Sequence, residues 1–233
     1  MGTTRDIWGD WLPVLAERYR LVRFDTRGFG DSAAAAPRDG TWSLDLLADD
    51  ALAIADAAGA ATFHLVGESL GGTVGMYLAT RNADRLASLT ICSASHRGAS
   101  IERVGEWRRF VGARGMATWS ATMMEHRFAP GAIDPARHEW FERAQATCSA
   151  DVTLDVADML IGADLAPRLP SIRTPMLILA PAASPFVPVE VAREIHALVP
   201  GSEIQVFAGV KHGLAFSHGR QCAAALAAFL ARV

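Results

Sequence analysis

Short apolar runs alternate with amphipathic stretches along most of the chain. The runs are rich in Val, Leu and Ile, as expected of strands that are buried on both faces of a parallel sheet. Between them, apolar residues recur three and four positions apart, which indicates helices. The predicted strands cover residues 20–24, 62–66, 86–92, 176–179 and 203–207, and the predicted helices cover residues 8–17, 44–58, 70–80, 189–198 and 220–232. This alternation predicts an α/β fold with a mainly parallel sheet and helices on both faces.

Residues 100–168 interrupt the alternation. They show helical periodicity without strands and hold three of the six tryptophans, Trp107, Trp119 and Trp140. We expect a helical cap here, inserted between two core segments, residues 1–99 and 169–233. Such a cap would cover the carboxyl edge of the sheet, where ligands bind in open α/β folds.

Composition narrows the functional classes. With 233 residues and 51% apolar content, the chain can bury one core of ordinary size. Its net charge of −3, from 22 basic and 25 acidic residues, speaks against a nucleic-acid partner. Three widely spaced cysteines suggest neither a disulfide framework nor a metal site, and they fit a cytoplasmic location. The longest apolar run near the C-terminus, residues 222–231, is too short to span a bilayer, so no membrane role is expected.

A serine motif lies between a predicted strand and a predicted helix. Residues 67–71 read Gly-Glu-Ser-Leu-Gly, which matches G-x-S-x-G, a strained turn that lifts a nucleophilic serine above the sheet. The flanking strand and helix are the context that this motif requires. Ser69 is therefore the predicted nucleophile, and the Leu70 N–H is the predicted oxyanion donor. The alternative is a glycine-rich turn with an incidental serine.

His212 follows the last predicted strand, in the loop sequence Gly-Val-Lys-His-Gly. A histidine at this place, downstream of the serine, occupies the position of the general base in the hydrolase chain order. It would take the Ser69 proton and return it to the leaving group. The alternative is a solvated loop histidine.

These features together resemble the α/β-hydrolase superfamily over essentially the whole chain. The resemblance rests on Phe-Asp-Thr-Arg-Gly-Phe-Gly-Asp-Ser at residues 24–32, the Ser69 turn, Leu-Thr-Ile-Cys at 89–92, Pro-Met-Leu-Ile-Leu at 175–179 and the His212 loop. It implies a serine hydrolase that needs no cofactor.

Within the superfamily, the chain resembles the 3-oxoadipate enol-lactonases. This resemblance rests on the Asp-Thr-Arg-Gly turn, the strand that ends at Cys92, and a cap that holds Trp107, Arg108 and Gly-Met-Ala at residues 115–117. This likeness implies a small ester or lactone as substrate. Arg108 and Arg127 are candidate binders of an anionic group, and Trp107 is a candidate wall of the pocket. Solvated surface arginines are the alternative for both.

The chain departs from the family at the triad acid. The resemblance places an aspartate at residue 184, but the chain has Ser184. A serine hydroxyl can orient the imidazole but offers no full charge to the imidazolium, and such a loss can cost about 10⁴ in turnover. We therefore expect weakened activity, unless Glu102, Asp164 or Glu190 supplies the carboxylate.

The second departure is at the N-terminus. The resemblance places Met1 at the second oxyanion position and implies a preceding strand between residues 20–24 and 62–66, for which the chain has no residues. Its absence would leave buried backbone groups unpaired. One hypothesis is that the chain starts at an internal methionine of a longer natural protein; in the other, the two neighbouring strands pair directly. Equal stability of a version extended upstream would contradict the first.

Several functions stay open. A general esterase and a carbon–carbon bond hydrolase share this fold, because cap side chains set the substrate. A degenerate, non-catalytic binding protein is favoured by Ser184 and by the missing strand, but opposed by the intact Ser69 and His212. A homo-oligomer is compatible with the fold, although no diagnostic interface is visible in the sequence.

Overall fold

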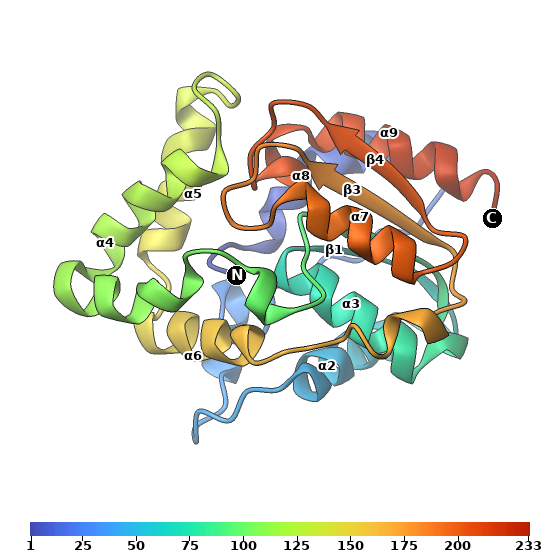
Figure 1. Ribbon diagram of the computed structural model, residues 1–233, viewed down its shortest axis with the longest axis horizontal. Helices are drawn as coiled ribbons and strands as arrows, with labels where there is room; N and C mark the ends of the chain where they lie inside the picture. Colours follow the sequence, from blue (N-terminus) through green and yellow to red (C-terminus); the bar gives the residue numbers. More distant parts are fainter.

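The computed structural model describes residues 1–233 and contains one parallel sheet of four strands (Figure 1). The strands are β1 (Phe63–Glu68), β2 (Leu86–Cys92), β3 (Met176–Pro181) and β4 (Glu203–Phe207), and they lie in the order β1-β2-β3-β4. The register pairs Glu68 with Cys92 and Cys92 with Leu179. The strands therefore end at a common edge, and four of the five predicted strands are confirmed.

The helices agree closely with the predicted ranges. They are α1 (Leu12–Leu15), α2 (Leu44–Ala57), α3 (Leu70–Arg81), α4 (Trp107–Arg127), α5 (Pro135–Ala146), α6 (Ala150–Ile161), α7 (Val189–Leu198), α8 (Leu214–Ser217) and α9 (Gly219–Leu230), with 3₁₀ turns η1 (Arg5–Trp11), η2 (Gly30–Ala35), η3 (Ala83–Arg85), η4 (Gly98–Ser100), η5 (Val104–Glu106) and η6 (Leu169–Ser171). The helix predicted over residues 8–17 forms only in part, as η1 and α1. Ser43 caps α2 by accepting a hydrogen bond from the Leu46 N–H, which satisfies an amide of the first turn.

The central strands β2 and β3 are buried, whereas β1 and β4 are more exposed. Because alternate residues of a strand point in opposite directions, a buried strand contributes to a core on each face of the sheet. On β3, Met176 and Ile178 join a core with side chains of α2, α3 and α7. Leu177 and Leu179 join a second core with Trp11 and the apolar face of α9. This arrangement is the doubly covered sheet that the Val- and Leu-rich runs predict.

The strand predicted over residues 20–24 is absent. This segment is extended, but its backbone forms no hydrogen bond with other backbone groups, and it does not pair with β1. Val22 and Phe24 remain 50% and 36% exposed. A cavity of about 560 Å³, lined by both segments, separates them. Because a strand requires a hydrogen-bonded neighbour, the predicted strand and the hypothesis of direct pairing are both wrong for this structure.

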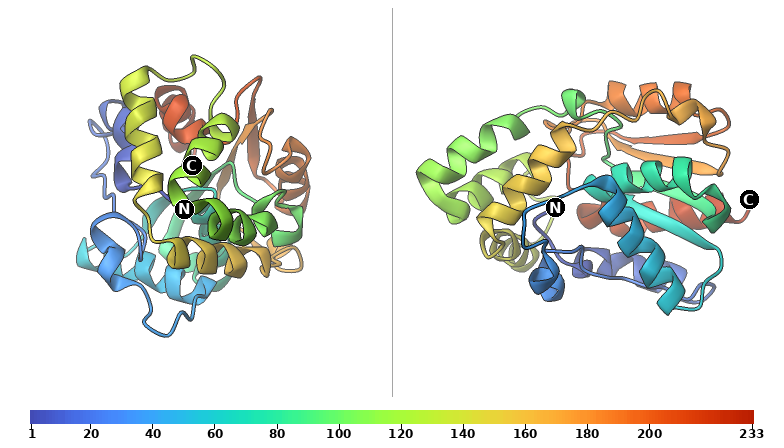
Figure 2. Two further views of the ribbon diagram at one scale, coloured as in Figure 1. Left: turned by 90° about the vertical axis from the view of Figure 1, so that its left-hand side faces the viewer. Right: turned by 90° about the horizontal axis from the view of Figure 1, so that it is seen from below.

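Residues 98–171 contain helices and no strand. Figure 2 shows α4, α5 and α6 gathered beyond one end of the sheet. A hydrogen bond from the Glu102 N–H to the Phe186 carbonyl ties this segment to the loop that follows β3. None of the helices is long and apolar enough to cross a membrane.

Candidate active site

Ser69 occupies the sharp turn between β1 and α3. Its backbone has φ 54° and ψ −116°, a left-handed conformation that is costly for a residue with a side chain. The turn is tight: a Cβ on Gly67 would lie 2.3 Å from the backbone of Gly71, and one on Gly72 would lie 2.4 Å from Ala94. Gly67 and Gly72 therefore allow the close approach that lifts the Ser69 hydroxyl to the edge of the sheet.

His212 lies beside Ser69, in the loop after β4. Its Nε2 is 3.2 Å from the Ser69 Oγ, and its Nδ1 is 3.2 Å from the Ser184 Oγ. The ring is 4% exposed, so burial holds the pKa of His212 well below its usual value, and the nearby Arg127 guanidinium lowers it further. His212 is thus neutral at neutral pH, as a general base must be before it accepts a proton.

Ser184 contacts three groups at once. Its Oγ lies 3.3 Å from the Phe186 N–H and 3.1 Å from the Val187 N–H, and both amides donate to it. A hydroxyl has two acceptor lone pairs and one proton. With both lone pairs engaged, its proton points to Nδ1 of His212. This arrangement favours the tautomer in which Nε2 carries the hydrogen, and that nitrogen then cannot accept the Ser69 proton.

No carboxylate pairs with His212. The three acids considered from the sequence lie elsewhere: Asp164 contacts Arg97 at 3.6 Å, Glu190 contacts Arg193 at 3.2 Å, and the Glu102 side chain is exposed. None of the three therefore serves as a triad acid in this structure.

The predicted oxyanion donors flank the serine. The Leu70 N–H belongs to the first turn of α3, where amides have no acceptor within the helix. Met1 lines the same pocket as Ser69. Its nitrogen is an amino group, and burial together with Arg127 lowers the pKa of that group to about 6. It therefore differs from the peptide N–H expected at this position.

Arg127 points into the pocket of Ser69 and His212 from the last turn of α4. It is 7% exposed, and burial lowers its pKa to about 10. Its Nε–H donates to the Gln145 Oε1 at 2.7 Å, and its guanidinium lies 5.6 Å from the centroid of the Phe141 ring. No carboxylate forms a salt bridge with it, although the charge of Glu68 acts on it and opposes the fall of its pKa. Because buried charges are normally paired, this guanidinium is suited to receive an anion.

Arg108 has a different environment. It is exposed and binds Asp155 at 2.9 Å and Asp158 at 2.6 Å, away from the pocket. These partners satisfy its charge, so its predicted role in substrate binding is not supported. Trp107 does line the pocket, and it packs edge-on against the fully buried Trp119.

Other residues of the pocket were not singled out from the sequence. Phe186 packs edge-on against His212, with ring centroids 5.0 Å apart, and it also contacts Trp107. Ser93, directly after β2, has φ 52° and a buried hydroxyl without a partner. Its place at the carboxyl end of a central strand was the available signal. Gln145, which accepts a hydrogen bond from Arg127, had no such signal in the sequence, because this contact joins two separate helices.

The loop that carries the base is tied to α4. The Gly213 N–H donates to the Arg127 carbonyl at 2.9 Å, and a Cβ at Gly213 would lie 2.3 Å from the Phe128 ring. The segments that carry His212 and Arg127 are therefore linked through the backbone.

Comparisons with known proteins identify the family of the chain. The family model described as "alpha/beta hydrolase fold" matches residues 1–153. The "Putative carbamate hydrolase RutD" of Caulobacter segnis is 27% identical over 224 residues, which are 91% of this chain and 82% of that protein. The "3-oxoadipate enol-lactonase 2" of Acinetobacter baylyi is 25% identical over 228 residues, covering 94% and 83%. The resemblance to enol-lactonases is confirmed, and carbamate hydrolases are a second similar group.

Solved structures show the same fold. A hydrolase from Pseudomonas aeruginosa PA01 superimposes with a TM-score of 0.87 at 24% identity, over 98% of this chain and 86% of that one. The enol-lactonase from Burkholderia xenovorans LB400 superimposes with a TM-score of 0.85 at 23% identity, over 99% of this chain and 88% of that one. From its fold, its serine turn and these matches, the chain belongs to the α/β-hydrolase family and is a hydrolase.

Proposed function

We propose that this protein is a serine hydrolase of small carboxylic esters or lactones that carry an anionic group. One observation carries the proposal: the buried, unpaired Arg127 shares a pocket with the hydrogen-bonded pair of Ser69 and His212. The enol-lactonase relatives support the lactone, and the RutD relatives add carbamates as a second substrate class.

In the proposed reaction, the Ser69 Oγ attacks the carbonyl carbon while Nε2 of His212 takes its proton. The Leu70 N–H donates to the developing oxyanion. The C–O bond to the leaving group breaks as His212 returns the proton, and water then releases the acyl group from Ser69 by the same steps. Before the first step, His212 must adopt the tautomer with hydrogen on Nδ1, which Ser184 disfavours.

We further propose that residues 100–168 act as a cap that moves to admit substrate. The pocket around Ser69 has a volume of only about 20 Å³, close to the space of one water molecule. Val104 and Trp107 form part of its wall on the helical side, and Phe186 forms part on the core side. A substrate therefore enters only after these groups separate.

A fluorophosphonate probe, which reacts with activated serines, tests the nucleophile. Wild-type protein should be labelled and should hydrolyse small esters or lactones, whereas Ser69→Ala should lose both while it keeps the wild-type melting temperature. Turnover that persists in Ser69→Ala would refute the assignment. A folded wild type that neither reacts with the probe nor turns over any member of an ester, lactone and carbamate panel would favour the non-catalytic alternative, which the hydrogen bonds of Ser184 already suggest.

Arg127 is predicted to select the anionic group. Arg127→Gln should raise KM for an anionic ester roughly 10- to 100-fold, because a hydrogen bond to a charged group contributes about 1.5–3 kcal/mol. It should have little effect on KM for a neutral ester of the same size. Arg108→Gln is the matched control, since its partners lie outside the pocket. Equal effects of Arg127→Gln on both esters would show that Arg127 does not read the substrate charge.

A further inference from the structure

Ser93 lies beside the nucleophile at the carboxyl edge of the sheet. In the register of β1 and β2, Glu68 pairs with Cys92, so the next step of the ladder places Ser69 next to Ser93. The Ser69 N–H donates to the Cys92 carbonyl at 2.8 Å, and the Ser93 N–H donates to a carbonyl of β3 at 3.1 Å. Because neighbouring strands are about 4.8 Å apart, the backbone of the core holds the two serines close together.

The Ser93 residue has two features that packing alone does not explain. Its φ of 52° is costly for any residue with a side chain. Its hydroxyl is buried without a hydrogen-bond partner, which destabilises the folded state, and the residue is only 4% exposed. Both costs fall at a position that lines the pocket of Ser69 and His212. Such costs are typical of functional positions.

Apart from the nucleophile and Ser93, the hydroxyls that line this pocket are engaged. The Thr73 hydroxyl donates to the Ser95 carbonyl at 2.7 Å, and the Ser95 hydroxyl donates to a backbone carbonyl two residues further on, also at 2.7 Å. Two other buried hydroxyls lack partners, those of Thr90 and Thr153, but neither lines the pocket. Ser93 therefore offers the pocket a hydroxyl that is free to bind a small polar molecule.

We propose that Ser93 positions the water that releases the acyl group from Ser69, an inference that rests on the proposed function. The water oxygen attacks the acyl carbonyl carbon, one of its hydrogens passes to Nε2 of His212, and the other donates to the Ser93 hydroxyl oxygen. The C–O bond to Ser69 then breaks as His212 returns the proton to the Ser69 Oγ. Ser93 keeps its own proton throughout.

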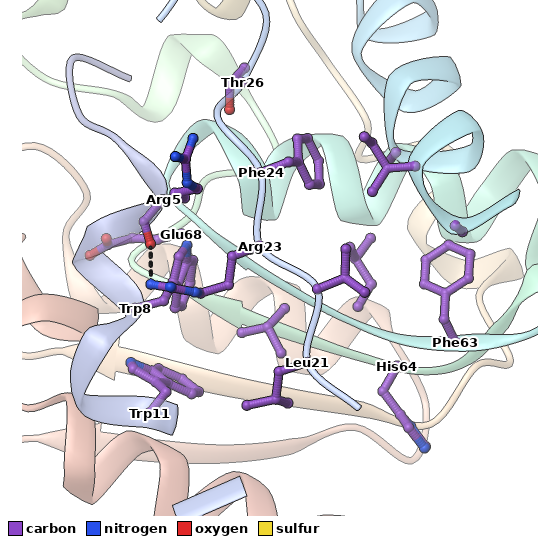
Figure 3. Close-up of a pocket in the computed structure, with 18 of the residues that line it drawn as sticks. Arg5, Trp8, Trp11, Leu21, Arg23, Phe24, Thr26, Phe63, His64 and Glu68 are labelled. Atoms are coloured by element: carbon purple, nitrogen blue, oxygen red, sulfur yellow. Dashed lines mark hydrogen bonds between the residues drawn. The ribbon is translucent and has the colours of Figure 1, made fainter. Parts of the chain in front are cut away.

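The size of the pocket and the place of Ser93 fit this role. The pocket of about 20 Å³ is close to the space of one water molecule, and a bound water needs two to four polar partners. Ser93 follows β2 of the core, so it stays beside Ser69 when the proposed cap moves. Glu68 lines the larger cavity of about 560 Å³, whereas Ser69 and Ser93 do not (Figure 3). The water is therefore held by groups of the small pocket.

Competition between water and methanol tests this role. Both attack the same acyl-enzyme with one O–H aimed at His212, but only water has a second hydrogen for Ser93. Loss of the Ser93 hydroxyl should therefore slow hydrolysis and leave methanolysis unchanged, whereas a merely structural role would slow both alike. The substrate is 4-nitrophenyl acetate in buffer that contains methanol, and the readout is the ratio of acetate to methyl acetate, with Ser69→Ala as the background.

Ser93→Ala should lower this ratio roughly 2- to 10-fold, the size expected for one neutral hydrogen bond, and should not lower the melting temperature. Ser93→Gly adopts the positive φ without strain and should lower the ratio to the same extent. Thr90→Val is the matched control, because it removes a buried, unpartnered hydroxyl outside the pocket. It should keep the wild-type ratio.

An unchanged ratio in Ser93→Ala and Ser93→Gly would overturn the proposal. A rise in KM at an unchanged ratio would also overturn it, since Ser93 would then bind the substrate and not the water. Wild-type protein that releases no more 4-nitrophenolate than Ser69→Ala would overturn the proposed function, and this inference with it. Failure of the inference alone is therefore distinguishable from failure of the proposed function.

Discussion

At the scale of single residues, the hydrogen bonds of Ser184 bear directly on the strength of the base. An aspartate at this position can only accept hydrogen bonds, so it holds the hydrogen of His212 on Nδ1 and leaves Nε2 free. Ser184 accepts from two amides and has a proton left to donate to Nδ1. The substitution therefore does more than remove a charge, because it also favours the unproductive tautomer.

Ser184→Asp is predicted to raise kcat by up to about 10⁴-fold, the scale of the loss when a triad acid holds its histidine in the wrong tautomer. The new carboxylate can still accept from the amides of residues 186 and 187. Ser184→Ala is the control, since it removes the donor to Nδ1 without adding a charge. The ¹⁵N chemical shifts of His212 report its tautomer directly. An unchanged tautomer and an unchanged kcat in Ser184→Asp would contradict this account.

Single residues also show what the sequence can predict. Local motifs point to Ser69 and His212, the family resemblance points to Ser184, and the structure brings all three together. The contrast between Arg108 and Arg127 could not be predicted, because it depends on which carboxylates lie across the fold from each guanidinium.

At the scale of elements, the junction of β1 and α3 depends on close backbone contact. A Cβ at Gly67 would lie 2.3 Å from the backbone of Gly71, which no side-chain rotation can relieve, whereas a Cβ at Gly71 meets nothing within 4 Å. Of the two glycines of the motif, only Gly67 is required by a close contact.

Gly67→Ala should lower the free energy of unfolding by at least about 1–3 kcal/mol, the usual cost of overpacking. Gly71→Ala, in the first turn of α3, should leave stability unchanged or raise it by up to about 1 kcal/mol. Urea unfolding measures both. Equal destabilisation by the two substitutions would show that the close approach at Gly67 is not what limits the turn.

Hydrophobic periodicity correctly predicts the strands and helices whose packing partners are present in the structure. The four paired strands and helices α2, α3, α7 and α9 lie close to their predicted ranges. Residues 20–24 include the apolar Leu21, Val22 and Phe24, but a strand also needs a hydrogen-bonded partner, which the sequence of the segment does not reveal.

At the scale of the whole molecule, the stability of the fold depends on the charge of Glu68. Burial raises the pKa of Glu68 to about 7, while Arg127 and the Ala215 N–H oppose this shift. The unfolded chain releases the same proton near the ordinary pKa of 4.5. Between these values the folded state holds a proton that the unfolded state has lost, so this group lowers stability as pH rises through the window.

Glu68→Gln should therefore stabilise the protein more at about pH 8 than at about pH 5, because the amide stays neutral and can still accept from Ala215. The Met1 amino group, whose pKa of about 6 is affected by Glu68, titrates in the same window, so both proteins are compared with that amino group acetylated. Denaturant unfolding at the two pH values measures the difference. If the two proteins differ in the free energy of unfolding by the same amount at both pH values, Glu68 is ionised throughout this range.

The hydrogen bond from Gly213 to the Arg127 carbonyl has a consequence for how this enzyme can diverge. The end of α4 carries the group proposed to bind the substrate's anionic group, and the loop bound to it carries His212, the proposed base. A substitution that shifts one also displaces the other, so changes in these two segments should be epistatic. New substrate preferences are then more accessible through Trp107 or Phe186, which line the pocket without this backbone link.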